Sequence, residues 1–250
     1  MTTNAIDRVQ KVIACDSRWS MVVDQQHLAF VDNTGFDKLS NREFHTMVFA
    51  GDAVLIDQWK SWFQADVLEL TDTPPHQRLE GNQLMTLFVS LVNKEDNSVI
   101  FHSGWWLHHR EYASFSGSGA THAHDCYVTN GCAKRSIDTA GLNDHATGGD
   151  TKFVELSTNV HNLPAAQATL AHAVQQLNER GFVMNTETKV ITPIKDFSDS
   201  TAEALRALAA GERSLTAPTG LPTKCWSEGQ KEALQIALND VARREAEARK

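Results

Sequence analysis

Residues 1–20, MTTNAIDRVQKVIACDSRWS, decide the fold at the start of the chain. Residues 2–7 and 11–17 alternate apolar and polar side chains around a short polar turn, which is typical of a β-hairpin. If a methionine aminopeptidase removes Met1, Thr2 carries a hydroxyl and a free α-amine. That amine has an unperturbed pKa of about 8, so part of it is neutral near physiological pH. It can take the proton of its own hydroxyl, directly or through a water, and the stretch therefore predicts a nucleophilic N-terminus.

Composition and charge restrict the class of protein. The 250 residues are 41% hydrophobic and 22% charged, as in an ordinary globular protein. The net charge of -8 without a basic cluster argues against a nucleic-acid partner, because phosphate binding needs grouped Lys and Arg. No apolar run is long enough to span a membrane, and the N-terminus does not read as a secretory signal. The four cysteines are scattered, so we expect reduced thiols in a cytoplasmic protein.

Hairpins dominate the rest of the chain. The expected strands continue through residues 27–39, 45–53, 83–92, 97–109, 112–120 with a Gly-rich turn at its end, 152–156 and 182–194. The expected helices cover residues 52–65, 120–143 with a break near 130, and 162–180, the last started by Asn162 and Pro164 and stopped at Gly181. This order predicts an α+β fold of mainly antiparallel sheets with helices layered outside.

The sequence pattern changes from mainly strands to mainly helices after about residue 195. Two amphipathic helices are expected there, with Ser200 and Ser227 as N-caps, joined by the Pro/Gly-rich stretch 217–224. The sequence thus predicts one domain over residues 1–195 and a helical C-terminal extension over residues 196–250.

A nucleophilic N-terminus needs a buried cation, a carboxylate that holds this cation, and backbone N–H groups that receive an oxyanion. Asp16 ends the second strand, and Lys38 precedes the next strand pair. The segment FSGSG at residues 115–119 offers backbone amides that open a helix. NDHATGG at residues 143–149 adds Asp144 and the hydroxyl of Thr147 in a tight turn.

These motifs, in this order over residues 2–156, resemble the proteasome β-subunit and HslV superfamily of N-terminal-nucleophile (Ntn) hydrolases. The matching positions are Thr2 for the nucleophile, Asp16 and Lys38 for its charged partners, Ser118 between Gly117 and Gly119 for the GSG segment at the oxyanion, and Asp144 and Thr147 for an Asp and a Ser, with Thr standing for Ser. The resemblance implies a four-layer αββα sandwich and a threonine-type peptidase or amidohydrolase that forms an acyl-enzyme on Thr2. It also implies a homo-oligomeric ring that acts on peptides or unfolded proteins, with an ATP-dependent unfoldase as a possible partner and no metal or organic cofactor.

Other interpretations stay open. The chain departs from the family in a short stretch from Ser118 to Asp144 and in the lack of room for a second helix before residue 83. These departures favour a non-catalytic ring or scaffold subunit, and an amidase for a small metabolite is a third possibility. Thr2 can be only the start of a strand, with Met1 retained. Asp16 and Arg18 can form a hairpin-end ion pair, Lys38 can be a solvated charge, and Asp144 can be a helix C-terminal or turn residue.

Two further features have ordinary alternatives. Gly117, Gly119, Gly148 and Gly149 can be simple turn glycines. The run THAHDC at residues 121–126 contains metal-ligand residue types, but neighbouring helix positions point apart, so we expect ordinary polar helix residues there.

Overall fold

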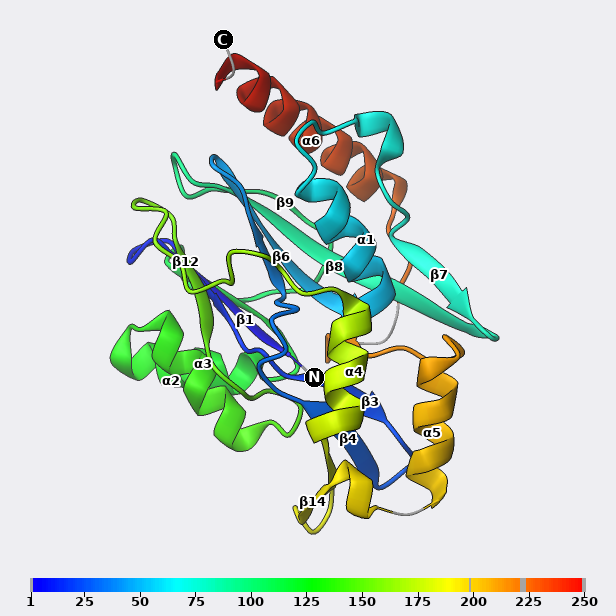
Figure 1. Cartoon of the computed structure of the whole chain (residues 1–250). Coiled ribbons are helices and arrows are strands. Elements are labelled where there is room, and N and C mark those ends of the chain that lie inside the picture. Colours follow the sequence, from blue (N-terminus) through cyan, green and yellow to red (C-terminus); the bar gives the residue numbers. More distant parts are fainter. Residues whose placement is uncertain (1, 198, 221–223, 249–250) are drawn as a thin grey trace.

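The computed structural model describes residues 2–197, 199–220 and 224–248. The chain is an α+β protein with two β-sheets and six α-helices in its described part, and all of the strand pairs found there are antiparallel (Figure 1). The expected fold class of mainly antiparallel sheets with helices is therefore confirmed.

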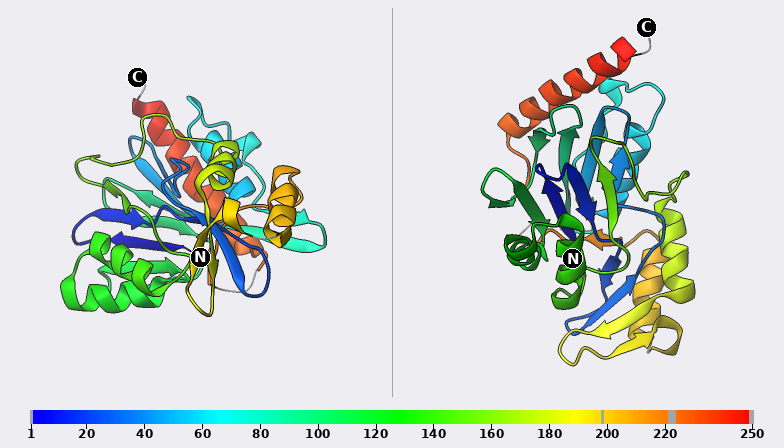
Figure 2. Two further views of the ribbon diagram at one scale, coloured as in Figure 1. Left: turned by 60° about the horizontal axis from the view of Figure 1, so that its bottom comes forward. Right: turned by 90° about the vertical axis from the view of Figure 1, so that its left-hand side faces the viewer.

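The smaller sheet contains the N-terminal hairpin. Its five strands, in spatial order, are β10 (Leu107–His109), β11 (Ala113–Gly117), β1 (Thr3–Asp7), β2 (Val12–Cys15) and β12 (Lys152–Glu155). Helices α2 (Ala120–Asn130) and α3 (Ala133–Asn143) pack on it. Figure 2 shows this helix pair on one side of the molecule, away from the other helices.

The larger sheet has ten strands. Its main path runs β14 (Ile191–Pro193), β13 (Phe182–Asn185), β4 (His27–Val31), β3 (Trp19–Val22), β15 (Thr216–Ala217), β6 (His45–Asp52), β8 (Gln83–Asn93) and β7 (Gln77–Glu80). Two short strands lie off this path: β5 (Leu39–Asn41) pairs with β6, and β9 (Val99–His102) pairs with β8.

Three hydrophobic clusters hold these elements together. One joins the larger sheet to helices α1 (Ala53–Phe63), α4 (Leu170–Arg180), α5 (Asp199–Ala209) and α6 (Glu228–Ala248). A second joins the smaller sheet to α2 and α3, and a third lies between residues of the two sheets. Strand β2 contributes to two of these clusters, because successive side chains of a strand point to opposite faces of the sheet. Val12 and Ala14 belong to the second cluster, and Ile13 and Cys15 belong to the third.

The expected start of the helix after residue 162 is wrong. Helix α4 begins at Leu170, where the Thr169 hydroxyl accepts the N–H of His172 at 3.3 Å. Asn162, the expected cap, instead extends the β12 edge, since its side-chain oxygen accepts the N–H of Phe153 at 2.9 Å. The predicted end is confirmed, with Gly181 as the C-cap.

The two C-terminal helices form, but only one is capped as expected. Helix α5 begins at Asp199, so Ser200 lies inside it and is not its N-cap. Ser227 caps α6: its hydroxyl accepts the Gln230 N–H at 3.2 Å, and the Gln230 side chain accepts the Ser227 N–H at 2.9 Å.

Residues 196–250 also contribute to the body of the molecule. Leu215 and Ala217 are fully buried in the cluster that contains Trp19 and Phe49, and Trp226 joins the same cluster. The domain boundary near residue 195 stays a prediction. Between α1 and β8 the chain forms a 3-10 turn, Leu70–Asp72, and strand β7, and no second α-helix.

Candidate active site

The N-terminal hairpin brings Thr2 and Thr3 against Asp16. Strands β1 and β2 pair with Asn4 opposite Cys15, and beyond this pair the N–H of Asp16 donates to the Thr3 carbonyl at 3.2 Å. The Thr2 hydroxyl donates to Asp16 Oδ1 at 2.6 Å, and the backbone N–H of Thr3 donates to the same oxygen at 2.9 Å. The antiparallel register thus places the first described residue on the carboxylate that ends the second strand.

Lys38 completes this cluster from another part of the chain. It lies directly before β5, and its Nζ donates to Asp16 Oδ1 at 2.8 Å. The Lys38 side chain is fully buried and that of Asp16 is 1% exposed. Lys38 is therefore not a solvated charge, and the expected alternative of an Asp16–Arg18 pair is wrong because Arg18 pairs with Asp32 at 2.8 Å.

The Asp16 carboxylate is fully used as an acceptor. Its second oxygen accepts the backbone N–H groups of Arg18 at 3.1 Å and Gly148 at 3.2 Å. Five donors thus converge on one buried carboxylate, and both of its oxygens are satisfied as hydrogen-bond acceptors. This arrangement fixes the position of the Thr2 hydroxyl.

A second chain of hydrogen bonds starts at Thr3. The hydroxyls of Thr3 and Thr147 lie 2.7 Å apart, and Thr147 donates to Asp144 Oδ2 at 2.6 Å. Ser118 donates to the same Asp144 oxygen at 2.7 Å. Because the Thr147 hydroxyl donates its one proton to Asp144, the Thr3 hydroxyl is the donor in the hydrogen bond to Thr147. Asp144, which is the C-cap of α3, thus holds Ser118 and Thr147 beside the first residues of the chain.

Gly117 and Gly119 are required where the chain passes Thr2 and Thr3. Gly117 has a φ of +89°, and a Cβ there would lie 2.0 Å from the Thr2 carbonyl oxygen. A Cβ on Gly119 would lie 2.1 Å from the Thr3 hydroxyl oxygen. The Gly119 N–H donates to the Thr2 carbonyl at 3.4 Å. Gly117, the last residue of β11, and Gly149 have the positive φ that one interpretation expected, whereas Gly119 and Gly148 do not and are selected by close packing.

Burial also changes the ionisation of groups beside Lys38. It raises the pKa of the Cys15 thiol, which therefore stays protonated next to Asp16. It lowers the pKa of Lys60 to about 8, although the Asp37 charge acts in the opposite direction. Lys60 donates to the carbonyl of Asp37, the residue before Lys38, and so helps to hold the turn that carries Lys38.

All eight predicted site residues lie in this region: Thr2, Asp16, Lys38, Gly117, Ser118, Gly119, Asp144 and Thr147. Sequence reasoning gave no role to Thr3, which links the Thr2–Asp16–Lys38 cluster to the Asp144 chain. The doubled threonine was the available signal, because adjacent strand residues point to opposite faces and can serve two networks at once. Met1 lies outside the described residues.

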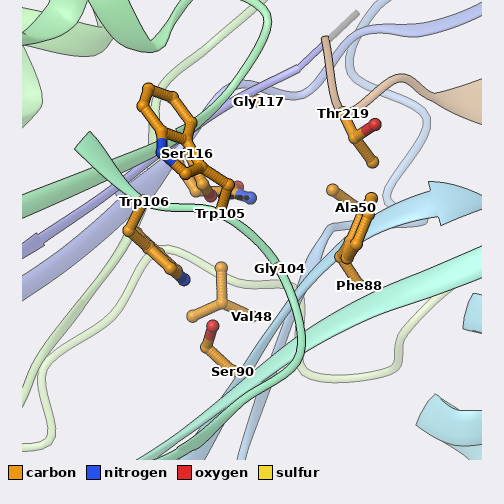
Figure 3. A pocket seen from close by; sticks show the side chains of 11 residues that line it. Val48, Ala50, Phe88, Ser90, Gly104, Trp105, Trp106, Ser116, Gly117 and Thr219 are labelled. Carbon is orange, nitrogen blue, oxygen red and sulfur yellow. Dashed lines mark hydrogen bonds between the residues drawn. The ribbon is translucent and has the colours of Figure 1, made fainter. Parts of the chain in front are cut away.

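A small cavity borders the site. It is lined by Asn4, Val48, Ala50, Phe88, Ser90, Gly104, Trp105, Trp106, Ser116, Gly117 and Thr219 (Figure 3). Figure 3 shows Thr219, Ala50 and Phe88 on one side of the cavity and Trp105 and Trp106 on the other. The Asn4 side-chain oxygen is buried here without a hydrogen-bond partner in the described structure. The cavity is thus mostly apolar with one unused acceptor, and it adjoins the glycine that covers Thr2.

Comparisons with known proteins give no identification. The chain matches no protein-family model, and no curated protein is significantly similar to it. Within the described ranges, no helix is long and apolar enough to cross a membrane. Over the same ranges, no three His, Cys, Asp or Glu side chains are placed to hold a metal ion, and the THAHDC run is part of α2.

Proposed function

We propose that this protein is a threonine-type Ntn hydrolase that cleaves amide bonds through Thr2. The observation that supports it best is the buried contact of the Thr2 hydroxyl and the Lys38 ammonium with one oxygen of Asp16. Asp144, Thr147 and Ser118, which the resemblance assigns to the same site, support the proposal because they reach Thr3 through hydrogen bonds.

The mechanism requires that Met1 be removed, so that the nitrogen of Thr2 becomes an amine. The neutral amine takes the proton from Thr2 Oγ1, and this oxygen attacks the substrate carbonyl carbon. The C–N bond then breaks, the leaving nitrogen takes the proton, and an ester on Thr2 remains. Water hydrolyses this ester and restores the hydroxyl.

Lys38 and Asp16 support these steps electrostatically. A buried cation close to the amine lowers the amine's pKa, since it disfavours a second positive charge. Asp16 holds this cation in place, and it also orients the Thr2 hydroxyl at 2.6 Å. The oxyanion role of the Gly117–Gly119 segment remains part of the proposal: the segment lies at Thr2, and the Gly119 N–H, which donates to the Thr2 carbonyl at 3.4 Å, must be released before it can receive an oxyanion.

The finer fold belongs to the same proposal. Two sheets with a shared hydrophobic cluster, and helix clusters on both, support a four-layer αββα sandwich. We further propose a homo-oligomeric ring in the cytoplasm that acts on peptides or unfolded proteins, with an unfoldase as partner. Exposed apolar side chains on the helices, such as Leu142 of α3 and Ile236 of α6, suit contacts between subunits.

One observation favours the alternative of a non-catalytic ring or scaffold subunit. Thr2 is fully buried, and its backbone N–H donates to the carbonyl of Pro218 at 3.2 Å. A Thr2 that keeps this amide and this cover cannot use its nitrogen as a base. The two functions therefore differ in whether Met1 is removed and the nitrogen of Thr2 is released from the Pro218 carbonyl.

Hydrolysis of a peptide-aminomethylcoumarin amide tests the proposal. We expect turnover by the wild-type chain, partial turnover by Thr2→Ser, and none by Thr2→Ala. A variant with Glu inserted between Met1 and Thr2, which blocks Met1 removal, is the matched control and is expected to be inactive while folded. Turnover by Thr2→Ala or by the blocked variant would reject Thr2 as the nucleophile.

A further inference from the structure

Strands β3 and β6 of the larger sheet are separated by a short strand from far along the chain. Strand β15 contains two residues, and Thr216 pairs with Ser20 of β3 on one side and Asp52 of β6 on the other. Ala217 pairs with Gly51. Both neighbours are much earlier in the sequence, so an extended segment has entered a gap between two strands that do not pair with each other in the described sheet.

We call residues 214–220 the strap. Hydrogen bonds to backbone groups of other segments hold it at several points. The Ala53 N–H donates to the Leu215 carbonyl at 3.0 Å, and the Thr2 N–H donates to the Pro218 carbonyl at 3.2 Å. The Thr216 hydroxyl donates to the Ser20 carbonyl at 3.2 Å.

The strap also packs tightly at both of its ends. Ser214 donates to Asp52 Oδ2 at 2.5 Å, and Asp52 is the N-cap of α1. Gly220 lies against Ser118, where a Cβ would come within 2.8 Å of the Ser118 Cα. The strap therefore runs from the start of α1, past Thr2, to the serine held by Asp144.

We propose that the strap is an internal pseudosubstrate, which occupies in cis the site where an extended peptide binds. This inference rests on the proposed function of Thr2. The gap between β3 and β6 recognises its occupant mainly through backbone hydrogen bonds, as strand addition does for peptides of many sequences. The Pro218 carbonyl accepts the backbone N–H of Thr2 at 3.2 Å, so the occupant of the gap places a peptide carbonyl beside the residue that carries the nucleophilic hydroxyl.

Displacement of the strap takes the buried Leu215 and Ala217 out of the core, but the segments on both sides of it can stay in place. Trp226 anchors the chain beyond it: the indole donates to the Leu87 carbonyl at 2.9 Å and stacks on His76 with ring centroids 4.4 Å apart. Before it, Gly211 has a φ of +73° and open space around it. A peptide that enters the gap can replace the backbone hydrogen bonds of the strap, and its side chains must refill the part of the core that the fully buried Leu215 and Ala217 occupy.

A reversible lock tests the proposal. Residues directly opposite in an antiparallel pair have Cα atoms about 4.5–5.5 Å apart, within the range that a disulfide needs. The variant Ser20→Cys with Thr216→Cys therefore ties the strap to β3 when oxidised and frees it when reduced. We would measure two quantities in both states. The first is the affinity for a fluorescein-labelled peptide with the strap sequence RSLTAPT, residues 213–219, and the second is the rate at which a peptide epoxyketone labels Thr2.

We expect the reduced form to bind the peptide at least tenfold more tightly than the oxidised form, and to be labelled at least tenfold faster. Equal behaviour of the two forms, whether both bind or neither binds, contradicts the strap proposal. Peptide binding that depends on the lock without any labelling of Thr2 supports the strap and rejects the hydrolase. Equal labelling in both states supports the hydrolase and rejects the strap.

A second variant pair does not depend on a new disulfide. Thr216→Pro removes a backbone N–H from the strap ladder, and Thr192→Pro makes the same exchange in the edge strand β14. We expect at least tenfold tighter peptide binding by Thr216→Pro than by Thr192→Pro. Equal affinities of these two folded variants would contradict the proposal.

Discussion

The ammonium of Lys38 lies 2.8 Å from the carboxylate of Asp16, and neither side chain is open to solvent. Burial of an ion pair costs desolvation free energy that its attraction often fails to recover, so such a pair is a poor device for stability alone. The pair is found where the Thr2 hydroxyl meets the same carboxylate. We therefore interpret it as part of the nucleophile's machinery.

Removal of one partner should separate stability from activity. We expect Lys38→Met to abolish amide hydrolysis and to lower the free energy of unfolding by about 3–5 kcal/mol, because Asp16 keeps a buried charge without its cation. The double variant Asp16→Asn with Lys38→Met should regain most of that stability and stay inactive. Urea unfolding and the coumarin assay measure both effects. Turnover near the wild-type rate in either variant would contradict the assigned roles.

Close packing at Gly119 gives a second prediction. We expect Gly119→Ala to lose activity at least a hundredfold, because the new Cβ would lie 2.1 Å from the Thr3 hydroxyl and must displace it. Gly141→Ala is the matched control: its Cβ meets its nearest neighbour at 3.7 Å within helix α3. That variant should keep its activity and gain about 0.5–1 kcal/mol of stability. Equal rates for both variants would show that the approach to Thr3 does not matter.

Much of this site could be predicted from sequence because its residues lie in short local patterns. Residues 1–20 predict a hairpin, and a hairpin necessarily brings its two ends together, so Thr2 and Asp16 meet. Gly117 and Gly119 are visible because only glycine suits such close approaches. Ser227 was a readable cap because its partner, Gln230, is three residues away.

The remainder depends on contacts between distant segments. Nothing in residues 214–220 marks Thr216 and Ala217 as a strand, since a two-residue strand has no periodicity and its partners Ser20, Gly51 and Asp52 lie far earlier in the sequence. The start of α4 was mispredicted for a related reason. Asn162 and Pro164 look like a helix start, but Asn162 is used by the edge of β12.

The Asp144 chain should matter for rate more than for folding. We expect Thr147→Val to lower kcat by roughly ten- to a hundredfold with little change in KM, because the valine breaks the link from Thr3 to Asp144 and keeps the side-chain shape. Thr147→Ser should keep most of the rate, since the hydroxyl remains.

Thr151→Val, which removes an exposed hydroxyl that donates to Asp138 at 2.5 Å, serves as the control for Thr147→Val. Steady-state kinetics of the three variants distinguish them. A Thr147→Val enzyme as fast as the Thr151→Val control would show that the hydrogen bonds from Thr3 through Thr147 to Asp144 have no part in the mechanism.

The buried His45 predicts how the free energy of unfolding changes at acid pH. Burial, with the Arg244 charge as a second cause, lowers the pKa of His45 to about 4, and both ring nitrogens lack a partner in the described structure. The folded state thus holds the neutral ring, while an unfolded His titrates near 6.5. The unfolded state binds more protons between these values, so stability is full above pH 6.5 and falls by about 3 kcal/mol as the pH drops toward 4.

Urea unfolding of His45→Phe between pH 7.5 and 4.5 checks this prediction. We expect the variant to lose much of the pH dependence, because its buried ring does not titrate. His161→Phe changes an exposed histidine and should keep the wild-type slope. The same slope in His45→Phe and in the wild type would assign the acid instability to other groups.

The central claim is that Thr2 is freed and acts as the nucleophile. Intact mass spectrometry of the purified chain, before and after incubation with a peptide epoxyketone, tests it most directly, because that reagent bonds to both the hydroxyl and the free amine of an N-terminal threonine. To remove any effect of the strap, we would use the wild type and Thr216→Pro side by side. We predict the loss of Met1 and a single adduct that maps to Thr2. Retained Met1 with no adduct in either form, or an adduct at another residue, would contradict the account.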